Sequence, residues 1–135
     1  MSAASFSWSD YLSLAEELGK RADEASLRSA VSRTYYYVYH LALSRAERNG
    51  FRPLTGGVHT QLWRLFVLSP EPQCHRLAVI AGRLKQKRER ADYEDIYARV
   101  GDDVPELLDT ARTFASLLNA LPSRHPSSSS MRQSY

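Results

Sequence analysis

The chain has 135 residues, of which 43% are hydrophobic and 24% are charged. These proportions are ordinary for a one-domain globular protein, and they exclude collagen-like and fully disordered chains. Cys74 is the only cysteine, which excludes an internal disulfide and a Cys-rich metal site. No apolar run approaches the ~18 residues of a membrane helix, and residues 1–10 do not read as a secretory signal. We therefore expect a soluble cytoplasmic protein without membrane contact.

The formal net charge is only +3, but the charges are unevenly distributed along the chain. Between residues 76 and 90, six basic residues accompany a single acid, and between residues 92 and 109 seven acids accompany a single arginine. A basic run of this kind is typical either of a surface that binds polyanions or of an ordinary solvated helix. The sequence leaves both interpretations open.

Apolar residues at helical spacing predict five helices, over residues 8–19, 24–49, 58–68, 73–91 and 104–121. Ser7 and Asp23 are expected N-caps, Gly50 an expected helix end, and Asp103 with Glu106 an expected capping box. No segment is typical of a strand, so we predict an all-α antiparallel bundle of four or five helices. This domain spans residues 1–121, and residues 122–135 are expected to form a flexible Ser-rich tail.

The second predicted helix has an ordinary apolar stripe and an unusual opposite face. Its apolar stripe comprises Leu27, Ala30, Val31, Thr34, Val38, Leu41 and Ala42. The opposite face carries Arg33, Tyr36, Tyr37 and His40, which cluster within about 100° of arc at 100° per residue. Arginine with aromatic residues is typical of an interface core rather than of a solvent face. We expect this helix to be covered on more than one side.

Several motifs of enzyme chemistry are absent from the chain. It contains no Gly-rich phosphate loop, no HExxH, no pair of cysteines and no Gly-x-Ser-x-Gly elbow. The four histidines lack the spacing of metal ligands on one helix. We therefore expect no metal and no tightly bound cofactor.

Two blocks of sequence stand out. The first runs from Asp23 to Tyr36, ends in Ser32-Arg33-Thr34-Tyr35-Tyr36 and is followed by His40, and the second runs from Leu84 to Tyr93 and contains Arg88-Glu89-Arg90-Ala91-Asp92-Tyr93. Together they resemble the HEPN domain family, in particular its small stand-alone prokaryotic members. The resemblance implies a helical bundle that forms a homodimer. It further implies RNA as a substrate, a role in toxin–antitoxin or defence systems, and a minimal nucleotidyltransferase as an antitoxin partner. Many members of the family are metal-independent endoribonucleases, and others bind without cutting.

The active motif of the family is an arginine, four to six residues, and then a histidine. Arg33 and His40 satisfy this spacing and project from one face of a helix, so they are the predicted catalytic pair. The histidine would take a proton from a ribose 2′-OH and the arginine would hold the scissile phosphate, leaving a 2′,3′-cyclic phosphate. Arg52 and His59 have the same spacing, but Pro53 and two glycines intervene.

The remaining candidate residues are predicted to bind or support the substrate: Tyr36, Tyr37, Arg88, Arg90, Asp92 and Tyr93. Structural interpretations stay open beside this one. Arg88 and Asp92 can form a pair at i, i+4, and Tyr93 can be a packing residue. Arg33 and His40 can equally belong to an interface. The alternative function is a non-catalytic module that binds a nucleotide, RNA or a protein partner.

Overall fold

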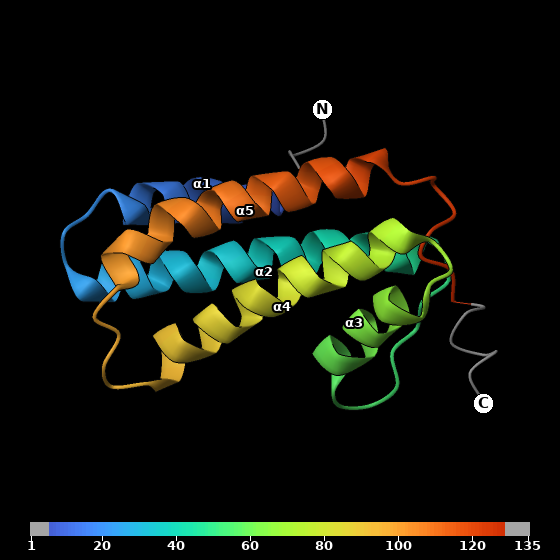
Figure 1. The fold of residues 1–135 in the computed structure, drawn as a ribbon, viewed down its shortest axis with the longest axis horizontal. Coiled ribbons are helices and arrows are strands. Elements are labelled where there is room, and N and C mark those ends of the chain that lie inside the picture. Colours follow the sequence, from blue (N-terminus) through green and yellow to red (C-terminus); the bar gives the residue numbers. More distant parts are fainter. Residues whose placement is uncertain (1–5, 129–135) are drawn as a thin grey trace.

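The computed structural model describes residues 6–128, which form five helices and no strand. The helices are α1 (Ser9–Gly19), α2 (Glu24–Arg48), α3 (Val58–Leu68), α4 (Pro72–Tyr93) and α5 (Val100–Ala120). Helices α1, α2, α4 and α5 alternate in direction, and the short α3 lies in the connection between α2 and α4 (Figure 1). The predicted all-α antiparallel bundle is confirmed. None of the described helices has the length and apolar character needed to cross a membrane.

Helix α2 is the central element, because it contacts each of the other four helices. Val31 and Val38 of its predicted stripe are buried, and so are Tyr35 and Tyr39 from other sides of the same helix. The expectation that this helix is covered on more than one side is therefore confirmed. The consequence is that polar and aromatic side chains of α2 lie between helices rather than in solvent.

Both ends of α2 are fixed by local hydrogen bonds that the sequence predicted. The Asp23 carboxylate accepts a hydrogen bond from the Ser26 backbone N–H at 2.9 Å. At the other end Gly50 has a φ of +94°, and its N–H donates to the carbonyl of Glu47. The N–H of the buried Phe51 donates to the carbonyl of Ala46, which completes a Schellman motif.

Of the other two predicted caps, one forms and one does not. Helix α1 is bounded by Trp8, which has helical dihedrals, and the Ser7 hydroxyl before it accepts a 3.3 Å hydrogen bond from the Ser9 N–H, as expected of an N-cap. Helix α5 begins at Val100, so Asp103 lies inside the helix and is buried. Its carboxylate accepts hydrogen bonds from the Tyr97 hydroxyl at 2.5 Å and from Lys87 Nζ at 3.0 Å. Because the Asp103 carboxylate binds these two side chains, it does not form the expected capping box.

The chain beyond α5 packs against the end of α2. The buried Arg45 guanidinium donates to four backbone carbonyls at 2.8–3.0 Å, those of Leu118, Leu121, Pro122 and His125. Pro126 is also fully buried. Within the predicted flexible tail, residues 125–128 are thus buried or half-buried, residues 122–124 are exposed, and residues 129–135 lie outside the described residues.

Candidate functional site

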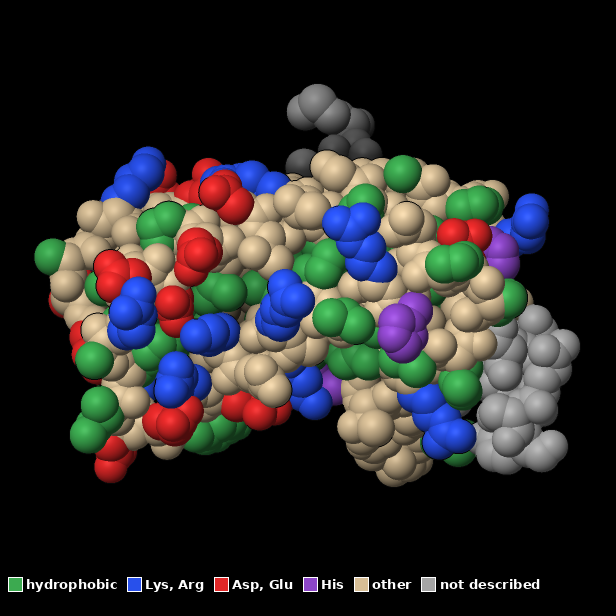
Figure 2. All heavy atoms as spheres, in the orientation of Figure 1, with side chains coloured by type: hydrophobic (Ala, Val, Ile, Leu, Met, Phe, Trp, Pro, Cys, Tyr) green, Lys and Arg blue, Asp and Glu red, His purple; other side chains and the backbone are tan. Residues whose placement is uncertain are grey.

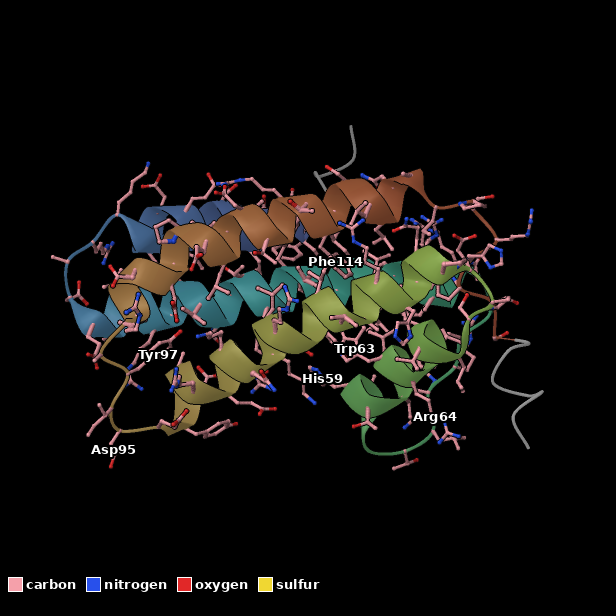
Figure 3. The ribbon with its side chains drawn as sticks, in the orientation of Figure 1. His59, Trp63, Arg64, Asp95, Tyr97 and Phe114 are labelled. Atoms are coloured by element: carbon pink, nitrogen blue, oxygen red, sulfur yellow. The ribbon has the colours of Figure 1, made fainter. Side chains whose placement is uncertain are left out.

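Tyr35, from the middle of α2, is at the centre of a hydrogen-bonded chain of three residues. Its hydroxyl accepts a hydrogen bond from Trp63 Nε1 at 3.1 Å and lies 2.6 Å from His59 Nδ1. Burial raises the pKa of Tyr35 to about 12, so the hydroxyl keeps its proton at neutral pH. That proton has one acceptor here, His59 Nδ1, which places the proton of the neutral imidazole on Nε2. Figure 3 shows His59 and Trp63 where α3 meets α4, whereas Arg64 lies on the outer side of α3.

His59 is held in the neutral form by its surroundings. Its ring stacks on Tyr39, with centroids 3.9 Å apart and an interplanar angle of 11°. Burial, and then the positive charges of Arg88 and Lys85, lower the pKa of His59 below its ordinary value. Within the described residues His59 Nε2 has no hydrogen-bond partner in the protein. This N–H is therefore a donor available to a ligand.

Arg88 is a second donor, and part of its guanidinium group has no hydrogen-bond acceptor among the described residues. Its side chain is only 9% exposed, and its guanidinium carbon lies 5.4 Å and 5.5 Å from the ring centroids of Tyr35 and Tyr36. The i, i+4 pair with Asp92 is present, but the closest distance of 3.7 Å is too long for a hydrogen bond. Arg88 Nε is buried with no hydrogen-bond partner in the described structure. A desolvated guanidinium with so few acceptors favours an additional anion.

Arg33 and His40, the predicted catalytic pair, both contact helix α1. The Arg33 guanidinium carbon lies 5.2 Å from the centroid of the Tyr11 ring, and the same ring is edge-on to His40 at 6.2 Å. His40 stacks flat on Trp8, with centroids 3.4 Å apart. Burial lowers the pKa of His40, which favours a neutral ring at pH 7. Tyr11 thus lies between the two predicted residues.

The two histidines belong to one continuous cluster of rings. His40 contacts Tyr39 at 5.0 Å and Tyr36 at 6.4 Å, and both tyrosines also contact His59. We name this the tyrosine–histidine cluster and define it as Tyr35, Tyr36, Tyr39, His40, His59, Trp63 and Arg88. It brings together side chains from α2, α3 and α4. Of the predicted site residues, Tyr36, His40 and Arg88 are members.

The other predicted site residues lie elsewhere. Tyr37 is buried in the core, where burial raises its pKa. Arg90 forms an ion pair with Glu94 at 3.4 Å, and Asp92 accepts a hydrogen bond from the Ser32 hydroxyl at 3.3 Å. Tyr93 is 76% exposed, so the packing interpretation of that residue is wrong. Arg88, Arg90 and Tyr93 nevertheless share one shallow hollow on the surface of α4.

Sequence reasoning missed the role of His59. The one signal was its spacing from Arg52, but Arg52 donates to the nearby carbonyls of Glu47 and Phe51 instead. The arginine that does influence His59 is Arg88, 29 positions later in the chain. No local motif records such a relationship, because it depends on how α3 packs against α2 and α4.

Comparisons with family models, with curated proteins and with solved structures give no match for this chain. The resemblance to the HEPN family therefore stays a prediction. No group of three or more His, Cys, Asp or Glu side chains within residues 6–128 is arranged to hold a metal ion.

Proposed function

We propose that this chain is an HEPN-like protein that binds single-stranded RNA at the tyrosine–histidine cluster. The observation that carries the proposal is the pair of donors described above. Arg88 has an unpartnered Nε and a long ion pair, and His59 Nε2 has no acceptor among the described residues. Both side chains contact Tyr35 and Tyr36. Two donors beside the same pair of tyrosines, one of them cationic, suit a phosphodiester group.

Aromatic rings beside these donors supply the second element of single-strand recognition. Tyr36 is half-buried in the cluster, and Tyr93 is exposed in the hollow that Arg88 lines. Bases of an unpaired strand stack on such rings, while the phosphates bind nearby cations. The resemblance to HEPN proteins favours RNA over DNA, and a DNA strand of the same sequence serves as the competitor.

Fluorescence anisotropy with a labelled, unstructured RNA of about 20 nucleotides tests the proposal. We expect His59→Ala and Arg88→Lys to weaken binding about tenfold, because each removes a charge-assisted or oriented hydrogen bond. Arg21→Ala and Arg64→Ala are the controls, since both residues are exposed and lie outside the cluster and outside α4. Circular dichroism establishes that each variant is folded. Unchanged affinity of the two cluster variants, or no RNA binding by the wild type, refutes the proposal.

A specific observation favours metal-independent RNA cleavage as a second candidate function. His40 is kept neutral by burial, and neither of its ring nitrogens is hydrogen-bonded within the described residues. Such an imidazole can take the proton of a ribose 2′-OH. The 2′ oxygen then attacks phosphorus, the departing 5′ oxygen takes a proton from water, and the His40 imidazolium returns its proton to the solvent. The products carry a 2′,3′-cyclic phosphate and a 5′-hydroxyl.

Incubation of end-labelled RNA in EDTA distinguishes the two candidates. If the protein is a nuclease, products with cyclic phosphate ends form, and His40→Ala abolishes them while RNA binding persists. In the same assay, Arg33→Ala tests whether cleavage needs Arg33, the predicted catalytic partner of His40. If the RNA is bound but stays intact, the protein is a binding module and not a nuclease. The homodimer and the nucleotidyltransferase antitoxin remain predictions from the resemblance, and analytical ultracentrifugation measures the first.

A further inference from the structure

The outer face of α4 carries four basic residues, which we name the basic stripe: Arg76, Arg83, Lys87 and Arg90. At 100° per residue they fall within roughly 60° of arc, on a face adjacent to the buried one. They extend over about 21 Å of helix axis. Figure 2 shows blue side chains along α4 on the face turned toward the viewer. The stripe is separate from Arg88, which points inward.

Two members of the stripe are neutralised by acids of the same chain. Lys87 pairs with Asp103 at 3.0 Å, and Arg90 pairs with Glu94 at 3.4 Å. Arg76 and Arg83 are exposed and have no ion pair or hydrogen bond in the part of the chain that the structure describes. These two are therefore the free cations of the stripe.

Arg76 and Arg83 both line a groove between α4 and α5. Val79 and Ile80 contribute apolar surface to the groove, and α5 contributes Asp109, Thr110 and Thr113. Asp109 is the one acid of the groove, and it pairs at 2.7 Å with Arg112 of its own helix, which also pairs with Glu16 at 3.5 Å. The two arginines are seven residues apart, which places them about 10 Å apart along the helix. The groove thus combines two free cations with a partly apolar lining.

The stripe connects this groove with the candidate site. Arg90 is at one end of the stripe and also lines the hollow that contains Arg88 and Tyr93. Arg76 is at the other end, in the groove against α5. A strand that enters the hollow at Arg88 can follow α4 past Lys87 to Arg83. The two acids of the hollow, Glu89 and Glu94, pair with Lys85 at 3.9 Å and with Arg90 at 3.4 Å.

From this continuity we infer that the basic stripe is the track for the backbone of the same RNA strand whose phosphodiester binds at Arg88 and His59. Arg76 and Arg83 bind successive segments of the phosphate backbone, and Val79 and Ile80 pack against ribose or base. The inference rests on the proposed function. It adds that the ligand is a strand of several nucleotides rather than a mononucleotide.

The test compares the double variant Arg76→Ala/Arg83→Ala with the wild type over a range of salt concentrations. The control is Arg21→Ala/Arg64→Ala, which removes two exposed arginines outside the stripe. With an RNA of about 20 nucleotides, loss of two phosphate contacts lowers the slope of log K against log salt by about 1.4. With an RNA of about three nucleotides, which fills only the cluster, the stripe variant binds like the wild type.

Each failure has its own signature. If the stripe variant keeps the wild-type salt slope for the long RNA while Arg88→Lys loses affinity, the stripe inference is refuted and the proposed function stands. Equal loss for both RNA lengths, or an equal effect of the control variant, also refutes the stripe inference. If the stripe variant keeps its RNA affinity but loses binding of a poly-glutamate peptide, the stripe is a surface for an acidic protein segment. Absence of RNA binding by the wild type refutes both proposals.

Discussion

At the scale of single residues, the protonation state of each histidine in the cluster is determined by the rings around it. His40 is covered by Trp8 and His59 by Tyr39, and burial lowers the pKa of both imidazoles. A neutral histidine donates or accepts a hydrogen bond without the desolvation cost of a buried cation. The aromatic neighbours therefore determine which chemistry these side chains can perform.

Removal of the Trp8 ring should raise the pKa of His40. In Trp8→Ala the imidazole gains water on the face that the indole covered, so the pKa of His40 rises toward its ordinary value of 6.5. An NMR titration of the ring Cε1–H resonances measures the change. Leu14→Ala, an exposed position on the same helix, is the control and should leave the titration curve of His40 in place. A pKa of His40 unaltered by Trp8→Ala would contradict the proposed cause.

Asp103 should make stability depend on acid pH. Burial alone would raise the pKa of this carboxyl, but hydrogen bonds from Tyr97 and Lys87 outweigh it and lower the pKa from its ordinary 3.8. The carboxylate therefore stabilises the fold fully above pH 3.8, and this contribution is lost as the pH falls through the lowered value. We expect Asp103→Asn to cost about 2 kcal/mol at pH 7.

Urea unfolding over a pH series measures this contribution. The difference in unfolding free energy between wild type and Asp103→Asn should shrink as the pH falls below 3.8. Asp102→Asn is the matched control, because its carboxylate is exposed and only 3.7 Å from Arg99 in an exposed pair. A difference that stays constant with pH would show that the Asp103 charge does not stabilise the fold.

The residues that sequence could assign are those with local partners. Asp23 caps a helix three residues away, and Gly50 ends the same helix, so spacing alone predicts both. The partners of His59, which lies on α3, are Tyr35 and Tyr39 of α2 and Arg88 of α4. Such a site follows from packing and cannot be read from spacing.

At the scale of elements, two glycines should respond in opposite ways to a methyl group. Gly50 has a φ of +94°, and a Cβ there would lie 3.1 Å from Ser128 Oγ, so Gly50→Ala should cost about 1 kcal/mol. Gly82 is inside α4 with open space around its added Cβ, so Gly82→Ala should stabilise by about 0.5–1 kcal/mol. Thermal unfolding of both variants shows whether each substitution raises or lowers the free energy of unfolding. A stabilising Gly50→Ala would contradict the assigned helix end.

Helix boundaries show where local signals were overruled. Sequence predicted that the last helix starts at residue 104, because Asp103 and Pro105 resemble a capped first turn. The helix starts at Val100 instead, and Asp103 turns inward to Tyr97 and Lys87. The capping signal was misleading because the same carboxylate has stronger partners on α4 and in the preceding loop.

At the scale of the whole molecule, the bundle was predictable because apolar periodicity and turn residues define each long helix independently. The central position of α2 was indicated by its tyrosines, which are too numerous for a solvent face. The assembly of the cluster was not predictable, since it needs the placement of α3 against α2 and α4 (Figure 1). By contrast, helical spacing already indicates that the basic run of residues 76–90 separates into an inward Arg88 and other basic residues on an adjacent face, and the burial of Arg88 confirms it.

The central claim is that a phosphodiester of RNA binds at His59 and Arg88. Its most direct test is an NMR titration that follows the histidine side-chain resonances while an unstructured RNA of about 20 nucleotides is added. We predict that the His59 resonances shift with the same saturation curve as RNA binding, and that an RNA of about three nucleotides, which fills only the cluster, shifts them as well but leaves those of the exposed His75 on α4 in place. RNA binding that saturates without any shift at His59 would contradict the claim.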